Sequence, residues 1–258
     1  MFGFLRRKKV EPPRIGVELG LERLVAVVLD SEQNIVGRQE QPAPGEDEDW
    51  SPTLEALFEG LPVRDSHLVV SLTHDYHLKT LELPQVDLDT IRREASCYLP
   101  YSVEEASFAW LPLNARRATV VAYPTELLEQ LTGLTRGLGS STLHFEAPEI
   151  AQHRLLEDAG LPGGLIEVLD DTLVATLASE EDFLTLRQDR SLTNLEAFVM
   201  LALDVWNKRG QPEPRHLLTN ASPNYLANLA RLEALELPAD SIPIYLAQSV
   251  DGPQRFSA

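Results

Sequence analysis

A predicted β-hairpin at residues 15–30 carries the first residues that could do chemistry. Two short aliphatic strands flank a tight turn, and the segment contains Gly16, Glu18 and Gly20. A glycine at such a turn lets backbone N–H groups approach a phosphate closely, and a nearby carboxylate suits Mg²⁺. The segment therefore predicts either an anion-binding turn or a hairpin kept only for architecture.

A second hairpin, predicted between residues 164 and 178, repeats the order of strand, acidic residue, tight turn and strand. Glu167 precedes its turn and Thr172 follows it. A third turn begins at Asn220, directly after a short predicted strand at residues 216–219. The repeated hairpin suggests an internal duplication, for which one pair of hairpins is weak evidence by itself.

The composition excludes several classes of function. The chain has 258 residues and a net charge of −18, which argues against nucleic acid as a partner because phosphate contacts need basic patches. Its single cysteine, Cys97, leaves no internal disulfide and no thiolate metal site. No apolar run approaches the roughly 20 residues of a membrane-spanning helix, and no signal peptide is present. These features predict a cytoplasmic protein.

The first 13 residues are expected to form a flexible tail. Phe2, Phe4 and Leu5 precede the four consecutive cations Arg6-Arg7-Lys8-Lys9. A few apolar side chains beside a basic cluster can touch an anionic membrane surface, although such a short segment would not anchor the protein by itself. Peripheral membrane contact and a merely disordered tail are both open interpretations.

The elements that position these residues follow from hydrophobic periodicity and from turn and cap residues. Strands are expected at residues 15–19, 24–29, 34–39, 67–72, 77–83, 106–111, 118–123, 143–145, 164–169, 172–178, 216–219 and 242–246. Helices are expected at residues 53–60, 87–98, 124–137, 148–159, 192–209 and 223–235. This alternation predicts a mixed α/β protein.

The order of elements divides the chain into a tail and three structural units. After the tail at 1–13, a first subdomain is expected at 14–63 plus 146–160, with an inserted two-layer α/β subdomain at 64–145. The pattern of the first hairpin restarts near Gly163, so residues 161–258 are expected to form a second domain. Few residues separate its hairpin from its next strand, which predicts that this domain is reduced.

Several segments together resemble the type IV pilus assembly protein PilM family, which is actin-like and related to FtsA. They are the Phe/Leu-plus-Arg/Lys start, the hairpin Ile-Gly-Val-Glu-Leu-Gly at 15–20, Leu-Glu-Leu-Pro at 81–84, Ile-Arg-Arg-Glu-Ala at 91–95 and Tyr-Leu-Pro-Tyr-Ser-Val-Glu-Glu at 98–105. The resemblance covers nearly the whole chain, and its motifs are moderately specific only as a set. The short MSHA-pilus MshI-like branch matches equally well.

The resemblance implies a fold and a partner. The fold would be an actin-like ATPase fold, a duplicated ribonuclease-H-like unit with an inserted subdomain. The protein would be an adaptor at the inner face of the bacterial inner membrane, where it would bind the N-terminal cytoplasmic tail of a PilN-like membrane protein as an extended peptide. The peptide would lie in a groove between the first subdomain and the inserted one, and the residues expected near this groove are Tyr98, Leu99, Pro100, Tyr101 and Val103. The alternative is that residues 99–101 only end a helix and pack.

The resemblance also marks Gly16, Glu18, Gly20, Glu167, Thr172 and Asn220 as the positions of a nucleotide site. The turns around them depart from the family pattern by adding bulk or negative charge: Leu21 and Glu22, then Leu169, Asp170 and Asp171, then Ala221 and Ser222. Such side chains would crowd a nucleotide or repel its phosphates. We therefore expect a vestigial site, no enzyme activity and no cofactor.

Two other functions are alternatives to the adaptor. An active actin-like assembly ATPase would need Glu18 and Glu167 to organise Mg²⁺ despite the unsuitable turns. A cell-division scaffold like FtsA would need a C-terminal amphipathic helix, which residues 251–258 cannot form. The first of these stays the alternative to the adaptor hypothesis, and the second ranks below it.

Overall fold

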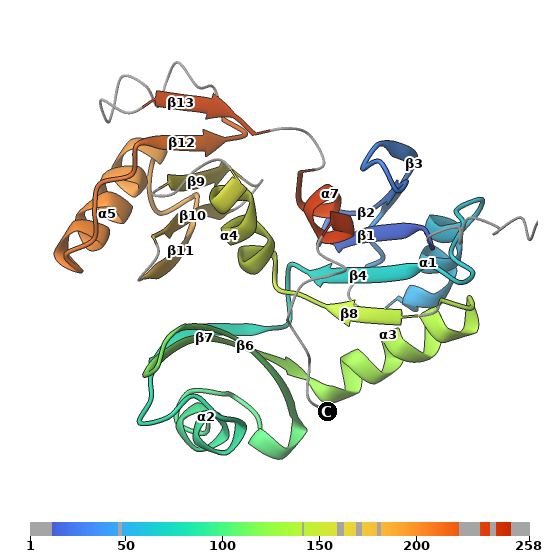
Figure 1. The fold of residues 1–258 in the computed structure, drawn as a ribbon, viewed down its shortest axis with the longest axis horizontal. Helices are drawn as coiled ribbons and strands as arrows, with labels where there is room; N and C mark the ends of the chain where they lie inside the picture. The colour runs from blue at the N-terminus through green and yellow to red at the C-terminus, as the bar shows by residue number, and fades with distance from the viewer. Residues whose placement is uncertain are drawn as a thin grey trace, which may run out of the picture.

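The computed structural model describes residues 12–45, 48–140, 142–158, 163–168, 172–179, 182–221, 233–237 and 241–248. Two five-stranded sheets and one three-stranded sheet form the framework (Figure 1). The basic tail at residues 1–11 and the second turn, with Leu169 and its two aspartates, lie outside the described residues. Ser222 also lies outside them.

The first sheet has the order β3-β2-β1-β4-β8. Its strands are β1 (Arg14–Leu19), β2 (Arg23–Leu29), β3 (Ile35–Pro42), β4 (His67–Leu72) and β8 (Thr142–Phe145). β1, β2 and β3 pair antiparallel in chain order, whereas β4 is parallel to β1 and β8 is parallel to β4. The predicted first hairpin is confirmed as the centre of this sheet.

The second sheet repeats this topology strand for strand, in the order β11-β10-β9-β12-β13. Its strands are β9 (Gly163–Val168), β10 (Thr172–Ala178), β11 (Phe183–Asp189), β12 (His216–Thr219) and β13 (Glu233–Glu236). β9, β10 and β11 are antiparallel neighbours, while β12 is parallel to β9 and to β13. The predicted duplication is therefore present in the fold.

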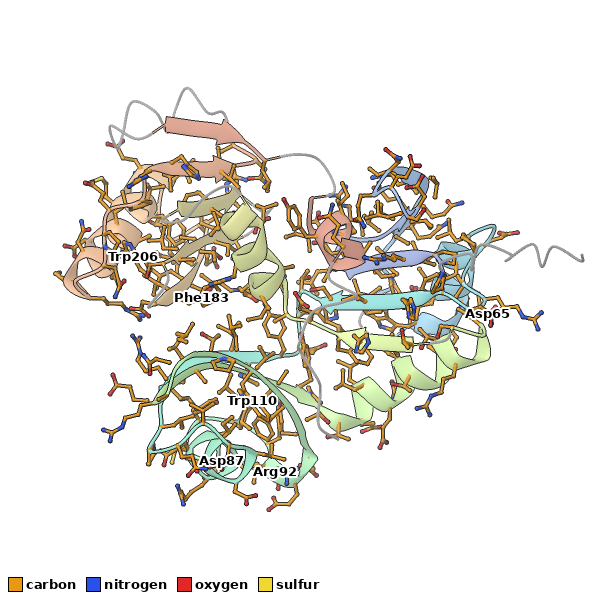
Figure 2. All side chains as sticks on the ribbon, in the orientation of Figure 1. Asp65, Asp87, Arg92, Trp110, Phe183 and Trp206 are labelled. Atoms are coloured by element: carbon orange, nitrogen blue, oxygen red, sulfur yellow. The ribbon has the colours of Figure 1, made fainter. Side chains whose placement is uncertain are left out.

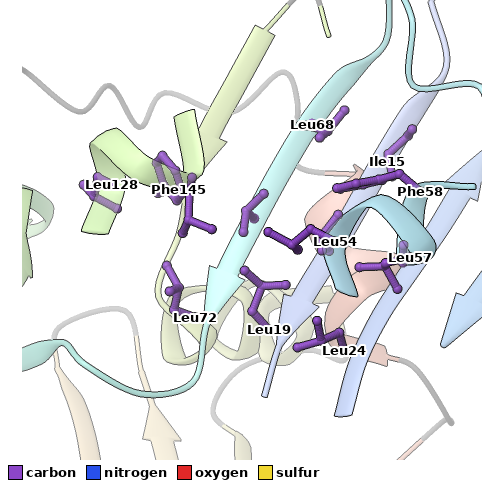
Figure 3. Close-up of a cluster of buried hydrophobic side chains, with 14 of the residues drawn as sticks. Ile15, Leu19, Leu24, Leu54, Leu57, Phe58, Leu68, Leu72, Leu128 and Phe145 are labelled. Atoms are coloured by element: carbon purple, nitrogen blue, oxygen red, sulfur yellow. The ribbon is translucent and has the colours of Figure 1, made fainter. Parts of the chain in front are cut away.

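Helices cover both faces of the first sheet. The inward residues of the strands pack against α1 (Trp50–Phe58) and α3 (Thr125–Gly137) in one apolar core (Figure 3). The opposite face packs against α4 (Pro148–Asp158) and α7 (Ser241–Gln248). A sheet buried on both faces explains why β2 is almost entirely aliphatic.

The second sheet is covered on one face by α5 (Leu195–Lys208), whose apolar side includes Trp206 (Figure 2). Asn194 caps this helix, because its side chain accepts a hydrogen bond from the Ala197 backbone N–H at 2.8 Å. The other face packs on α4, which therefore lies between the two large sheets (Figure 1).

The three-stranded sheet has the order β5-β7-β6, with β5 at His77–Glu82, β6 at Ala106–Asn114 and β7 at Arg117–Pro124. Helix α2 (Leu88–Ala95) covers one face, and a short 3₁₀ turn at Val103–Glu105 leads into β6. Figure 2 shows Trp110 of β6 on the side of this sheet toward α2. This unit is inserted between β4 and β8 of the first sheet.

Several expected boundaries and elements are wrong. The insertion is narrower than 64–145, because β4 and β8 pair with the first sheet and leave only residues 73–141 between them. The strand expected at 242–246 is α7, which packs on the first sheet although it was assigned to the second domain. The end of the helix expected at 223–235 is strand β13, and its residues 223–232 lie outside the described residues. Strand β11 was not predicted.

The second half is smaller than the first for one visible reason. Residues 73–141 separate β4 from β8 and build the inserted unit, whereas residues 220–232 alone separate β12 from β13. The matching position of the second sheet thus has no room for a comparable subdomain. This agrees with the expectation of a reduced second domain.

Candidate functional site at the junction of the two sheets

Helix α4 positions the candidate site because it packs on both large sheets at once. Ala151 packs with Val69 on the first sheet, while Leu155 and Leu156 pack with Leu165 on the second. The first turn of the helix carries Glu149, which is only 1% exposed. A carboxylate this deeply buried requires a charged or hydrogen-bonding partner.

Arg187 of β11 supplies that partner from the other half of the molecule. Its Nη2 lies 2.5 Å from Glu149 Oε1, and its guanidinium group lies 5.2 Å from the centre of the Tyr76 ring. The Tyr76 hydroxyl donates to the Glu149 carboxylate at 2.7 Å and also contacts Arg187. Arg187 Nη1 reaches the Thr73 carbonyl at 3.5 Å. We call Tyr76, Glu149 and Arg187 the Arg187 bridge.

The pKa values of Tyr76 and Arg187 are both raised within the Arg187 bridge. Burial, followed by the Glu149 charge, raises the pKa of Tyr76 well above its usual range. Burial lowers the pKa of Arg187, but the Glu149 carboxylate and Tyr76 outweigh it, so this pKa is raised. Tyr76 therefore stays neutral and Arg187 stays charged near neutral pH.

Glu167 of β9 lies beside the Arg187 bridge. Burial, then the nearby Glu18 and Glu149 carboxylates, raise its pKa to about 8, against smaller opposing effects of Arg187 and a hydrogen bond. That hydrogen bond comes from Gln152 of α4, whose Nε2 lies 2.5 Å from Glu167 Oε2. Gln152 Oε1 in turn accepts from the Thr176 hydroxyl at 2.6 Å. The structure thus brings the two predicted carboxylates, Glu18 and Glu167, close enough to influence each other.

The two glycines predicted in the first hairpin serve packing and turn geometry. A Cβ on Gly16 would lie 1.8 Å from the Pro243 carbonyl oxygen of α7, so only glycine lets this helix approach β1. Gly20 closes the turn, because its N–H donates to the Arg23 carbonyl at 3.0 Å. The exposed Leu21 occupies the tip of that turn.

The Asn220 side chain, just after β12, forms hydrogen bonds with the last residue of β9. Its Oδ1 accepts from the Val168 N–H at 2.8 Å, and its Nδ2 donates to the Val168 carbonyl at 3.1 Å. The side-chain amide thereby continues the strand pairing beyond Thr219. Thr172 begins β10 opposite Asp189 of β11.

The residues predicted for a partner groove lie on the inserted unit, where the Tyr101 ring lies 5.6 Å from the ring of His77. Tyr98, Leu99, Tyr101 and Val103 are half-buried against the apolar cluster under α2, and Pro100 is exposed. Lys79 Nζ of the edge strand β5 lies 4.6 Å from the centre of the Tyr98 ring. The Tyr98 hydroxyl is buried without a hydrogen-bond partner in the described structure, and burial raises its pKa to about 12.

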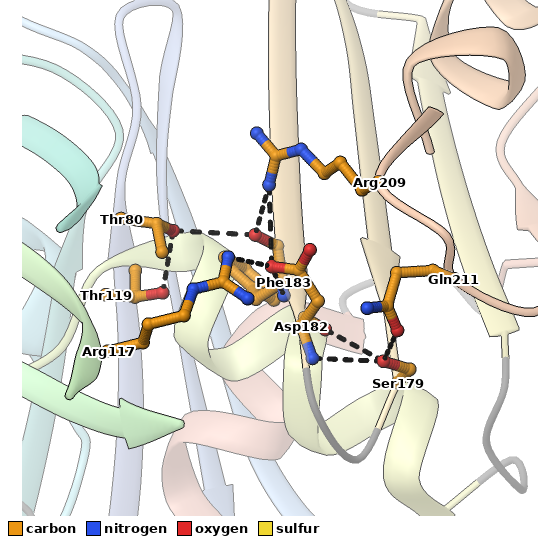
Figure 4. A network of polar contacts seen from close by, with 8 residues as sticks. All are labelled: Thr80, Arg117, Thr119, Ser179, Asp182, Phe183, Arg209 and Gln211. Atoms are coloured by element: carbon orange, nitrogen blue, oxygen red, sulfur yellow. Dashed lines mark hydrogen bonds and ion pairs between the residues drawn. The ribbon is translucent and has the colours of Figure 1, made fainter. Parts of the chain in front are cut away.

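A second polar network joins the inserted unit to the second sheet (Figure 4). Asp182, just before β11, accepts from Arg117 of β7 at 2.7 Å and from Arg209 at 3.4 Å. Thr80 of β5 donates to the Phe183 carbonyl at 3.4 Å. Asp182 is 1% exposed, so both cations compensate a buried charge.

The sequence did not single out Tyr76, Glu149, Gln152, Thr176 or Arg187. Each is an ordinary polar residue in its local segment, and only the packing of α4 and β11 brings them together. The one available signal was the period-two alternation of residues 183–189, which marks a strand.

Two observations in the described residues bear on whether a nucleotide with Mg²⁺ could bind at this junction. Arg187 is paired with Glu149, and an ionised Glu167 would add to the negative charge of the nearby Glu18 and Glu149 carboxylates. Within the described ranges, no group of three or more His, Cys, Asp or Glu residues is arranged to hold a metal ion. No helix in that part of the chain combines the length and the apolar character needed to cross a membrane.

The duplicated sheet with an intervening helix defines the class: the protein has an actin-like ATPase fold, as predicted. No protein-family model and no curated protein matches the chain. Among solved structures, a chain from a PilM-PilN type IV pilus biogenesis complex matches with a TM-score of 0.75 at 14% identity, over 93% of this chain and 99% of that one. At this identity the likeness to PilM is one of fold.

Two further structures share the fold over nearly their whole length. The cytoplasmic domain of EpsL, an inner membrane component of the type II secretion system of Vibrio cholerae, matches with a TM-score of 0.63 at 15% identity, over 94% of this chain and 96% of that one. A Bacteroides thetaiotaomicron protein of unknown function with an actin-like ATPase fold matches with a TM-score of 0.60 at 8% identity, over 95% and 99%.

Proposed function

We propose that this protein is a non-enzymatic adaptor of a type IV pilus assembly platform, at the cytoplasmic face of the bacterial inner membrane. The observation that carries the proposal is the match along the full length of both chains to a chain from a PilM-PilN type IV pilus biogenesis complex. The match to the cytoplasmic domain of an inner membrane secretion component supports the same setting. The partner would be the N-terminal cytoplasmic tail of a PilN-like membrane protein.

The chemistry of the junction supports the non-enzymatic part of the proposal. A phosphate-binding site needs open N–H groups and uncommitted cations, whereas here Arg187 already pairs with Glu149 at 2.5 Å. Glu167 next to Glu18 and Glu149 would repel an additional anion whenever it is ionised. The fold would thus be kept for its shape, and the active ATPase is the competing hypothesis.

The proposed docking region is the segment around Tyr98–Val103 on the inserted unit. The half-buried Tyr98 ring, with Lys79 over its face, offers an apolar contact to an extended peptide. The basic tail at residues 1–11 would add peripheral membrane contact through Phe2, Phe4, Leu5 and the Arg6–Lys9 cluster.

The test is isothermal titration calorimetry of the purified chain with two ligands. A synthetic peptide of the N-terminal tail of the PilN-like protein encoded in the same genome should bind, and ATP with Mg²⁺ should not. Absence of peptide binding would overturn the adaptor function. Low-micromolar binding of ATP with Mg²⁺ would instead establish the competing ATPase hypothesis.

Point substitutions locate the docking region. Tyr98→Ala should weaken peptide binding at least tenfold, while Tyr98→Phe separates the contribution of the hydroxyl from that of the ring. Met200→Ala, at an exposed site on α5, is the matched control and should bind the peptide like the original chain. Circular dichroism of each variant checks that the fold is retained. Equal affinities for all four proteins would place the docking region elsewhere.

A further inference from the structure

The junction between the two sheets brings carboxylates from three elements near one another in the described part of the chain. Glu18 from β1 and Glu149 from α4 both act on Glu167 from β9, and Arg187 from β11 acts on it with the opposite sign. Arg187 is in direct contact with Glu149 at 2.5 Å, whereas the hydrogen-bond donor to Glu167 is the neutral amide of Gln152. The negative charge of an ionised Glu167 would therefore be poorly compensated.

Glu18 and Glu167 hold matching positions in the duplicated sheets. Each is the second-last residue of its central strand, β1 or β9, and each projects from the strand face that α4 covers. Repulsion between these two residues would consequently act across the junction, on the relative position of the two halves.

We propose that Glu167 is a proton-controlled latch between the two halves of the molecule. As a neutral carboxylic acid it allows the ends of β1 and β9 to approach each other, and as a carboxylate it repels Glu18 and Glu149 and loosens the junction. The proton is exchanged with solvent at the Glu167 carboxyl group. The latch is a property of the isolated chain and requires neither the proposed partner nor a nucleotide.

The hydrogen-bond network around Glu167 can serve both protonation states. Gln152 presents Nε2 to Glu167 and accepts from Thr176 through Oε1. A half-turn of the amide would present Oε1 to a protonated Glu167 as an acceptor, and Nε2 to the Thr176 hydroxyl as a donor. Gln152 is 3% exposed, so this exchange takes place inside the protein.

The surrounding groups leave Glu167 as the residue that titrates. Tyr76 and Tyr123 have pKa values well above their usual range because of burial and of Glu149, so they stay neutral up to alkaline pH. Arg187 stays charged, since its pKa is raised. On α4, His153 faces the Phe183 ring at 5.5 Å.

The direction of the pH effect follows from the pKa of about 8 in the folded protein, above the ordinary value of 4.5. The folded state binds a proton that the unfolded state has lost, so stability falls as pH rises from about 4.5 toward 8. The contribution of Glu167 to stability is fully present below its ordinary pKa of 4.5. It is lost as the pH rises through the pKa of about 8 that Glu167 has in the folded protein. A slightly alkaline shift would loosen the junction.

The test compares thermal unfolding of the full chain between pH 6 and pH 9 with that of Glu167→Gln, which copies the neutral acid. We expect the difference in melting temperature, variant minus original chain, to increase by about 3 °C or more from pH 6 to pH 9. Glu55→Gln, at an exposed site on α1, changes the net charge equally and should leave the difference constant. Parallel curves for the original chain and Glu167→Gln would overturn the proposal.

Hydrogen exchange shows whether the junction itself opens. After correction for the intrinsic pH dependence of exchange, peptides from β9 and α4 should exchange faster above pH 8 in the original chain but not in Glu167→Gln. If the variant fails to fold, carbon-13 titration of the glutamate carboxyl groups in the original chain decides. A carboxyl midpoint above pH 7 supports the latch, and the absence of any such midpoint overturns it.

Discussion

Position 16 requires glycine because helix α7, more than two hundred residues further along the chain, packs closely against it. It lies in the middle of β1, where a hydrogen in place of a Cβ lets the backbone of α7 pass at Pro243 and Ala247. Glycine normally weakens a strand, so close backbone approach is the physical reason to retain it here. The sequence placed Gly16 at an anion-binding turn, but its structural role needs no ligand.

The substitution Gly16→Ala should destabilise the protein by about 3 kcal/mol, at the upper end of overpacking effects. The added Cβ would meet the Pro243 oxygen at 1.8 Å, and a helix backbone cannot move aside as a flexible side chain can. Gly133→Ala in α3 is the control, because nothing lies within 4 Å of its Cβ position and alanine favours helix. Urea unfolding measures both, and equal stabilities would contradict the packing argument.

At the scale of elements, the local sequence pattern predicted most of the fold but not helix α7 and strand β11. The segment Ile-Pro-Ile-Tyr-Leu-Ala at residues 242–247 looks like a strand by composition, yet it forms a helix. Proline is tolerated in a first helical turn, and Ile242 with Leu246 forms an apolar pair four residues apart, on the side that packs on the first sheet. Packing against β1 therefore decides between two conformations that the sequence left open.

The missed strand β11 explains why the candidate site was predicted only in part. Glu18 and Glu167 lie on strands with clear aliphatic patterns, so their meeting could be inferred from the duplication. Arg187 lies on a strand that alternates with polar residues at the edge of a sheet, where burial leaves a weaker signal. Its pairing with Glu149 depends on tertiary structure, which a single sequence does not specify.

A double-mutant cycle tests whether the Arg187 bridge holds β11 to α4. Arg187→Met should cost about 3 kcal/mol, because Glu149 is 1% exposed and would keep a buried charge without its cation. In a Glu149→Gln background the same substitution should cost at least about 1 kcal/mol less. Chemical denaturation of the four proteins gives the coupling energy, and strictly additive effects would show that the contact does not stabilise the fold.

At the scale of the whole molecule, β11 is the place where all three units meet. Arg187 joins it to α4 and the first half, while Asp182 and Phe183 at its start join it to β5 and β7 of the inserted unit. A partner that moved the inserted unit would therefore act on the second half through the Asp182 contacts. Each of these polar contacts can be removed separately by substitution of one residue.

Removal of the Asp182 carboxylate should separate the inserted unit from the second half. Asp182→Ala takes away the shared acceptor of Arg117 and Arg209 and an additional hydrogen bond from the Phe183 N–H at 2.8 Å, so a loss of about 3 kcal/mol is expected. Asp204→Ala breaks an exposed pair with Lys208 and should cost less than about 1 kcal/mol. Hydrogen exchange should accelerate in β5 and the start of β11 for Asp182→Ala alone. Unchanged exchange there, together with equal losses of stability for the two variants, would mean that these units are held together by apolar packing.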